Sequence, residues 1–136
     1  MAPIENGMVE VGTGEVTDRI IAFFEERAQH NIAMIMPGFI GVSPEGRGLP
    51  TQLSLFDEKQ VAGHKRLVDA IHSEGSLVAA QLYHAGRQAS EAITGLDPLA
   101  PSAIPCGILQ NHPKEITHEQ MDRIKEQFRQ AARWSI

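Results

Sequence analysis

Polar residues that could do chemistry gather in two short stretches of the sequence. One is the loop from Ser43 to Gly48, which contains Arg47, and the other runs from Gln81 to Arg87 and contains His84. Imidazole and guanidinium groups beside a strand end can steer a substrate or cofactor, but in turns they more often hold the loop by hydrogen bonds. We expect that structural role for His84, Arg87 and Arg47.

Neither metal ligands nor a nucleotide loop can be recognised. His64 lies on an apolar helical stripe and is expected to be a packed core histidine, while metal-ligand spacing is absent from the remaining candidates, His30, His72, His112 and His118. The run Gly46-Arg47-Gly48 lacks both the dinucleotide glycine pattern and a phosphate-loop lysine. The single Cys106 cannot form an intramolecular disulfide and is expected to be an inert thiol. We predict no bound metal.

Composition excludes several classes of partner. The chain has 136 residues, 42% of them hydrophobic, which suits one globular domain at most. Its net charge is −5, with 12 basic against 17 acidic residues, so neither nucleic acid nor an anionic membrane is an expected partner. Apolar runs fall far short of the roughly 20 residues that cross a bilayer, and no signal segment is recognised. The expected location is cytoplasmic.

The elements that must position these residues alternate along the chain. Helical spacing of Ile20, Ile21, Phe24 and Ala28 predicts an amphipathic helix over Thr17 to Gln29, opened by Thr17 or Asp18 as its cap. The apolar run from Ile32 to Met36 is then typical of a strand buried on both faces, and Pro37-Gly38 ends it. A polar loop leads to the next helix.

Two further helices are marked by capping boxes. Asp57 and Gln60 open the first, whose expected stripe is Val61, His64, Val68 and Ile71, and Gly75 ends it. A second buried strand is predicted from Leu77 to Leu82. The long stretch from Gly86 to Pro113 is expected to cover a functional site. Thr117 and Gln120 open the last helix, which carries the apolar stripe Met121, Ile124, Phe128 and Ala131.

Strands that alternate with helices indicate a parallel sheet, either open and doubly wound or closed into a (β/α)8 barrel. Periodicity does not choose between these two architectures. The chain offers two clear strands and a stub of a third at Met1-Ala2-Pro3, whereas a barrel takes about 250 residues.

A family resemblance makes the choice. The chain resembles the Old Yellow Enzyme or NADH:flavin oxidoreductase family, in its 2,4-dienoyl-CoA reductase and 2-enoate reductase branch. Six stretches carry the resemblance in order: Met1-Ala2-Pro3 with Glu5-Asn6-Gly7, Val16 to Arg19, Val42 to Gly48, Gln81 to Arg87, Pro101 to Pro105, and Thr117 to Glu119. The combination of Gln-Leu-Tyr-His-Ala-Gly-Arg with the upstream Ser-Pro-Glu-Gly-Arg loop is specific.

The resemblance implies an α/β fold of the (β/α)8 TIM-barrel family, present as an incomplete N-terminal fragment of about three βα units. Residues 1–136 then form a single partial FMN-binding domain, whose first strand is truncated and whose later strands are absent. Those later strands carry the family's substrate-holding pair, its proton donor and its phosphate loops. We therefore expect no catalytic residue within this chain.

The same resemblance implies which residues contact the flavin ring: Ala2, Pro3, Ile4, Glu5, Phe39 and Gln81. A glutamine at a barrel strand end projects at the catalytic face, where its carboxamide can both donate to and accept from the flavin pyrimidine edge. Phe39 aligns where relatives have a small residue, so its ring crowds the cofactor unless it rotates away or the register moves to Gly38. Gly7 falls where some relatives have an aromatic substrate contact.

The activity implied is transfer of hydride from NAD(P)H through FMN to an electron-poor C=C bond, as in an enoate or enoyl thioester. The partner is then a small unsaturated carbonyl compound, and we expect a homo-oligomer. A longer parent chain could add an iron-sulfur cluster and FAD. The alternative is a non-catalytic barrel fragment that self-associates or needs a complementing segment.

Overall fold

The computed structural model describes residues 1–109 and 111–136. Its helices are α1 (Asp18–Ala28), α2 (Val61–Ser73), the single turn α3 (Glu91–Thr94) and α4 (His118–Trp134), with 3-10 turns η1 (Glu58–Gln60) and η2 (Gly86–Gln88). The strands are short: β1 (Met34–Ile35), β2 (Phe39–Gly41), β3 (Leu53–Ser54), β4 (Leu77–Val78), β5 (Gln81–Tyr83), β6 (Leu99–Ala100) and β7 (Lys114–Glu115). The predicted alternation of helices and strands is confirmed.

Every strand pairing within the described residues is parallel. β1 pairs with β4, β2 lies between β3 and β5, and β6 pairs with β7. Met1 extends this sheet without forming a strand, because its N-terminal amine donates to Met34 O and its carbonyl accepts from Met36 N at 3.2 Å. The expected stub at Met1-Ala2-Pro3 therefore lies beside β1, but only Met1 makes these backbone bonds.

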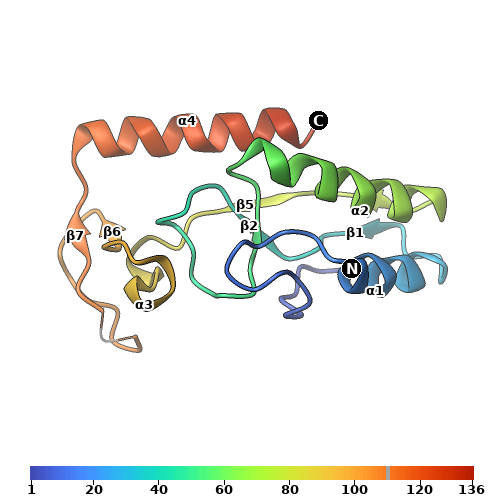
Figure 1. Ribbon diagram of the computed structural model, residues 1–136, viewed down its shortest axis with the longest axis horizontal. Coiled ribbons are helices and arrows are strands. Elements are labelled where there is room, and N and C mark those ends of the chain that lie inside the picture. Colours follow the sequence, from blue (N-terminus) through green and yellow to red (C-terminus); the bar gives the residue numbers. More distant parts are fainter. Residues whose placement is uncertain (110) are drawn as a thin grey trace.

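The core lies between the sheet and two helices. α1 and α2 pack side by side and cover one face of the strands, where Phe24, Ile35 and Ile71 are completely buried (Figure 1). Leu67 faces this core from α2, although the predicted stripe of α2 omitted it; Val61, His64 and Val68 are only half-buried. The actual stripe is rotated toward Leu67 because α2 packs against α1 as well as the sheet.

Local signals for helix ends are confirmed. The Thr17 side chain caps α1, and capping boxes form at Asp57 with Gln60 and at Thr117 with Gln120. The first box opens the 3-10 turn η1, from which α2 continues. Gly75 follows α2 with a φ of +84°, the left-handed conformation that ends many helices.

The strand predictions need correction. The expected strand from Ile32 to Met36 reduces to β1, and Pro37-Gly38 interrupts rather than ends the sheet, because β2 follows at once. The expected strand from Leu77 to Leu82 likewise divides into β4 and β5. Neither is buried on both faces: Met34 is 43% exposed and Leu77 59% exposed, because no element of the described chain covers that face of the sheet.

Two regions expected to be loops contain strands. β3 lies in the connection before α2, and the stretch from Gly86 to Pro113 contains η2, α3 and β6, with β7 just after it. β3 pairs with β2, whereas α3, β6 and β7 gather at the end of the molecule from which α4 runs back toward α2 (Figure 1). Pairs of two residues carry almost no periodic signal, so the sequence offered nothing that predicts them.

Candidate functional site

A bulge in the sheet sets the geometry of the candidate site. Ile35 lies opposite Val78, and Phe39 lies opposite Gln81. Along the chain, three residues lie between Ile35 and Phe39, but only two lie between Val78 and Gln81. One strand therefore has one extra residue, which reverses the alternation of its side chains. As a result Phe39 shares a sheet face with Gln81, and this face is also the one on which Leu77 is exposed.

Gly38 lies in this bulge and makes room for the segment after Met1. Its φ is +119°, and a Cβ placed on it would lie 2.5 Å from Glu5 Oε1 and 3.0 Å from the Ile4 carbonyl oxygen. The next amide, that of Phe39, donates a hydrogen bond of 2.9 Å to Glu5 Oε1. Glycine is needed here both for its conformation and for close approach.

The carboxyl group of Glu5 is half-buried in this contact. Burial raises the pKa of Glu5 above its usual value, and the hydrogen bond from Phe39 opposes the shift by favouring the charged form. Burial, with a smaller contribution from the charge of Glu5, also raises the pKa of Tyr83. The polar groups of this face therefore influence one another.

Phe39 does not stand free above the sheet. Its ring packs on that of Tyr83, the diagonal neighbour on β5, with centroids 4.4 Å apart and planes inclined by 37°. Phe39 is half-buried, whereas Gln81 directly opposite is exposed. Of the other expected flavin contacts, Ala2, Pro3 and Ile4 are exposed, and Ile4 is 53% accessible.

The structure thus places Phe39 against both Glu5 and Gln81 where β2 and β5 begin, with Ile4 against the same bulge. Sequence reasoning missed Tyr83 and gave Gly38 only as an alternative to Phe39. Alternation within Gln81-Leu82-Tyr83 could have revealed Tyr83, since residues two apart on a strand share a face. The bulge itself has no comparable sequence signal.

Of the three polar residues expected to hold loops, the side chains of Arg47 and His84 do so and that of Arg87 does not. Arg47 is buried, and its guanidinium donates to Gly12 O and, at 3.0 Å, to Pro50 O. His84 Nδ1 accepts a hydrogen bond of 3.0 Å from the Gly86 amide. Arg87 is exposed, and it is its backbone carbonyl that accepts a hydrogen bond, from Asn111.

Other features of the described chain give no competing site. Across residues 1–109 and 111–136, three or more potential metal ligands never come together, and no helix is long and apolar enough to cross a membrane. Cys106 is buried and unpaired with another cysteine. Cavities of about 250 and 510 Å³ lie beside α4 and α2, but the expected flavin contacts do not line them.

Short parallel strands covered by helices on one face, with an exposed glutamine where one strand begins, are the arrangement expected of part of an α/β barrel. Comparison with known proteins specifies the class. The chain belongs to the NADH:flavin oxidoreductase / NADH oxidase family, whose model matches residues 1–136. This confirms the resemblance to Old Yellow Enzyme found in the sequence.

Three relatives illustrate the match. The NADH oxidase of Thermoanaerobacter brockii is 38% identical over 121 residues, which are 88% of this chain and 19% of that protein. The Old Yellow Enzyme homologue of Zymomonas mobilis superposes with a TM-score of 0.87 at 25% identity, over 99% of this chain and 40% of its own. A 2-naphthoyl-CoA reductase in complex with 2-naphthoyl-CoA gives 0.91 at 25% identity, over 99% of this chain and 22% of its own.

The matches cover most of this chain but only a small part of each relative. The chain spans between about a fifth and two fifths of these relatives, and the matching structures are TIM barrels, whereas the described residues form α/β units without a closed barrel. This agrees with the expected incomplete barrel. The relatives' activities and ligands are statements about those longer proteins.

Proposed function

We propose that this chain supplies the flavin-ring side of an FMN-dependent oxidoreductase that takes hydride from NAD(P)H. The observation that carries the proposal is the exposed carboxamide of Gln81, opposite Phe39 and on the sheet face beside Glu5. Family membership supports the cofactor and its nicotinamide donor. When bound, FMN would supply the hydride carrier between the nicotinamide and the substrate.

The residues fit a planar heteroaromatic ring. Gln81 can donate to and accept from a ring edge that presents both carbonyl and N–H groups, while Ile4 and Pro3 offer exposed apolar surface. Because the Phe39 ring packs on Tyr83, it leaves Gln81 accessible. Ala2, Pro3, Ile4, Glu5, Phe39 and Gln81 therefore remain our proposed cofactor contacts, and we assign no catalytic residue.

The proposed substrate is an electron-poor alkene conjugated to a carbonyl, such as an enoate or an enoyl thioester. A structural relative in complex with 2-naphthoyl-CoA supports the thioester class, and the resemblance found in the sequence is our ground for proposing the 2,4-dienoyl-CoA reductase and 2-enoate reductase branch. The NADH oxidase relative is long enough that this chain covers only 19% of it. A parent of that length could add an iron-sulfur cluster and FAD, and we propose a homo-oligomer for the assembled enzyme.

A second candidate function is a non-catalytic barrel fragment that self-associates or binds a complementing segment. The exposed sheet face of Met34 and Leu77 favours it, because uncovered apolar strands seek partners. The two candidates are compatible, since an incomplete barrel can retain its ring contacts.

Flavin titration followed by NMR tests the proposed function. We expect weak binding at most, because none of the proposed contacts is cationic and ring contacts alone must offset the cost of immobilising the cofactor. At millimolar concentration, riboflavin and FMN should shift the Gln81 side-chain amide and the Phe39 backbone amide alike, while the exposed Gln29 side chain serves as an internal control.

Three outcomes are informative. Shifts confined to Gln81, Phe39 and their neighbours, and removed by Gln81→Ala but not by Gln29→Ala, support the site. Absence of shifts at both reporters, or shifts centred elsewhere, overturns it. Tight stoichiometric FMN binding, or a protein that is yellow as purified, contradicts the weak affinity and indicates phosphate contacts beyond those assigned.

A further inference from the structure

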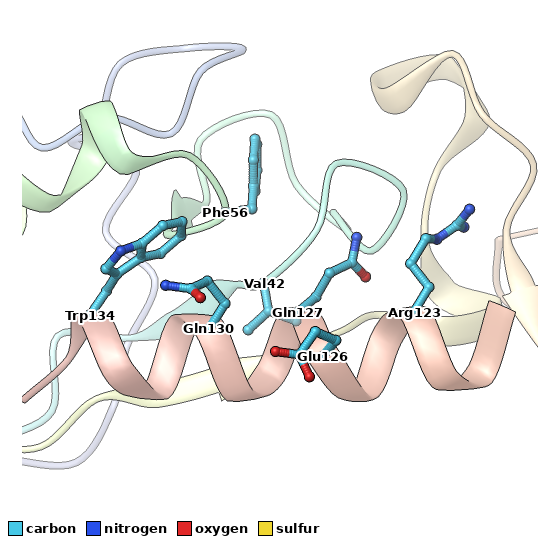
Figure 2. Close-up of a pocket in the computed structure, with 7 residues that line it drawn as sticks. All are labelled: Val42, Phe56, Arg123, Glu126, Gln127, Gln130 and Trp134. Carbon is cyan, nitrogen blue, oxygen red and sulfur yellow. The ribbon is translucent and has the colours of Figure 1, made fainter. Parts of the chain in front are cut away.

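Helix α4 is attached to the rest of the molecule mainly at its two ends. Only Ala131 is fully buried among its residues, and Trp134 packs against the main core near its C-terminus. A cavity of about 250 Å³ lies under the middle, between Gln127 and Gln130 of α4 and the side chains of Val42 and Phe56 (Figure 2). Apolar packing therefore contributes little to holding the N-terminal half.

An ion pair makes the attachment at that half. Arg123 Nη2 donates to Glu45 Oε1 at 3.0 Å, and the Glu45 side chain is only 9% exposed whereas that of Arg123 is 54% exposed. A carboxylate this buried is costly without a partner. Within the described residues, Arg123 is the basic side chain that forms an ion pair with Glu45.

Glu45 is packed against the end of β5. Its neighbour Gly46 touches the ring of His84 so closely that an added Cβ would lie 2.5 Å from His84 Cδ2. The Ala85 amide donates to Gly46 O at 2.9 Å, and the Val42 amide donates to Tyr83 O at 3.1 Å. The loop that carries Glu45 is thus joined to β5 on both sides of His84.

The ring of His84 lies close enough to Glu45 and Arg123 to feel both charges. Burial lowers the pKa of His84, while the charges of Glu45 and Arg123 act on it in opposite directions. Nδ1 is occupied by the Gly86 amide, and Nε2 is buried without a partner among the described residues. A ring held mainly by packing and by one hydrogen bond depends on the loop facing it.

We infer that Arg123 is a positioning residue: through Glu45 and the Gly46–His84 contact, it holds the C-terminal end of β5, the strand that begins at Gln81. Helix α4 lies outside the site, but it thereby sets the position of the proposed flavin contact Gln81, which precedes His84 by three residues. This role for Gln81 rests on the proposed function, but the mechanical link between α4 and β5 can be measured without flavin.

Hydrogen exchange followed by mass spectrometry tests the link, since it reports local opening and tolerates self-association. The reporters are the amides of Val42, Ala85 and Gly86, whose acceptors are Tyr83 O on β5, Gly46 O in the loop and His84 Nδ1. In Arg123→Gln we expect exchange at these amides to rise about threefold to tenfold, because a partly exposed ion pair contributes modestly. Exchange in α1 and α2 should not change.

Matched variants separate positioning from general stability. Arg129→Gln is the control, because Arg129 lies on the same helix with 64% side-chain exposure and pairs with Glu126 only one turn away. Arg123→Lys keeps the charge and should recover part of the protection. Glu45→Gln should reproduce the effect of Arg123→Gln, and the double variant should exceed neither single variant by much, since the two act through one contact.

The inference is overturned if Arg123→Gln and Arg129→Gln behave alike, if exchange rises uniformly across the chain, or if the two single effects add. The flavin titration described above fails or succeeds independently. If amide protection depends on Arg123 but flavin causes no NMR shifts at Gln81, the link between α4 and β5 stands and the proposed function is rejected. If flavin shifts Gln81 but amide protection does not depend on Arg123, the proposed function stands and the link is rejected.

Discussion

The Phe39 amide donates a 2.9 Å hydrogen bond to the Glu5 carboxylate, and this bond joins the segment after Met1 to the strand that faces Gln81. The contact exists because Gly38, the preceding residue, has no side chain to keep the two segments apart. One glycine and one hydrogen bond therefore fix the relative positions of three expected flavin contacts, Ile4, Glu5 and Phe39.

Replacing Gly38 should cost stability beyond the penalty of its backbone conformation. In Gly38→Ala the new Cβ would lie 2.5 Å from Glu5 Oε1, so we expect a loss of about 1–3 kcal/mol in the free energy of unfolding. Urea unfolding followed by fluorescence of Trp134, the only tryptophan of the chain, measures this loss.

Gly75→Ala is the matched control for that variant. Gly75 also has a positive φ, +84°, but an added Cβ would meet nothing within 4 Å, so only the conformational cost of about 1 kcal/mol applies. Equal losses in the two variants would contradict a role for close approach at Gly38.

His64 should make the protein less stable in mild acid. Burial lowers its pKa below the usual 6.5, and the hydrogen bond of 3.0 Å to Ser54 O opposes this only in part. Because the folded pKa is the lower one, the unfolded chain binds more protons between that pKa and 6.5, and stability rises with pH through this window. Below the folded pKa the penalty no longer grows.

Unfolding measured across this pH window tests the sign. His64→Gln should flatten the rise without abolishing it, since the lowered pKa of His84 acts in the same direction. A slope unchanged by His64→Gln would contradict the assignment.

The exposed sheet face should cause self-association. Met34 and Leu77 are register partners, 43% and 59% exposed, and the α4 stripe of Met121, Ile124 and Phe128 is only half-buried. We expect the chain to form oligomers or aggregates at micromolar concentration, because apolar area of this kind is rarely left uncovered. Light scattering after size exclusion measures the state.

Charges on that face should shift the chain toward monomers. Met34→Lys with Leu77→Lys tests this, and Ile108→Lys is the control, since Ile108 is 86% exposed but lies outside the sheet. A wild-type chain that is a compact monomer, with a sharp cooperative melt and no dye-binding surface, would refute the prediction.

Local rules sufficed where one stretch of chain carries its own signal. The caps at Thr17, Asp57 and Thr117 are confirmed because the side chain and the amide that it accepts from are at most three residues apart. The loop-holding role of His84 is confirmed for the same reason, since side chains in turns find nearby backbone groups. Arg47 also holds its loop, but it bonds both to nearby Pro50 O and to Gly12 O, which lies 35 residues earlier.

The sequence by itself determined the three long helices α1, α2 and α4, their alternation with the main strands, and the family, and it placed Gln81 in a strand. Only the tertiary structure decided the bulge before Phe39 and the pairing of β3 with β2 and of β7 with β6. It also decided the contact of Phe39 with Tyr83 and the ion pair between Glu45 and Arg123. The physical reason is range: helix periodicity and caps act within a few residues, whereas these contacts join segments whose meeting depends on how the whole sheet packs.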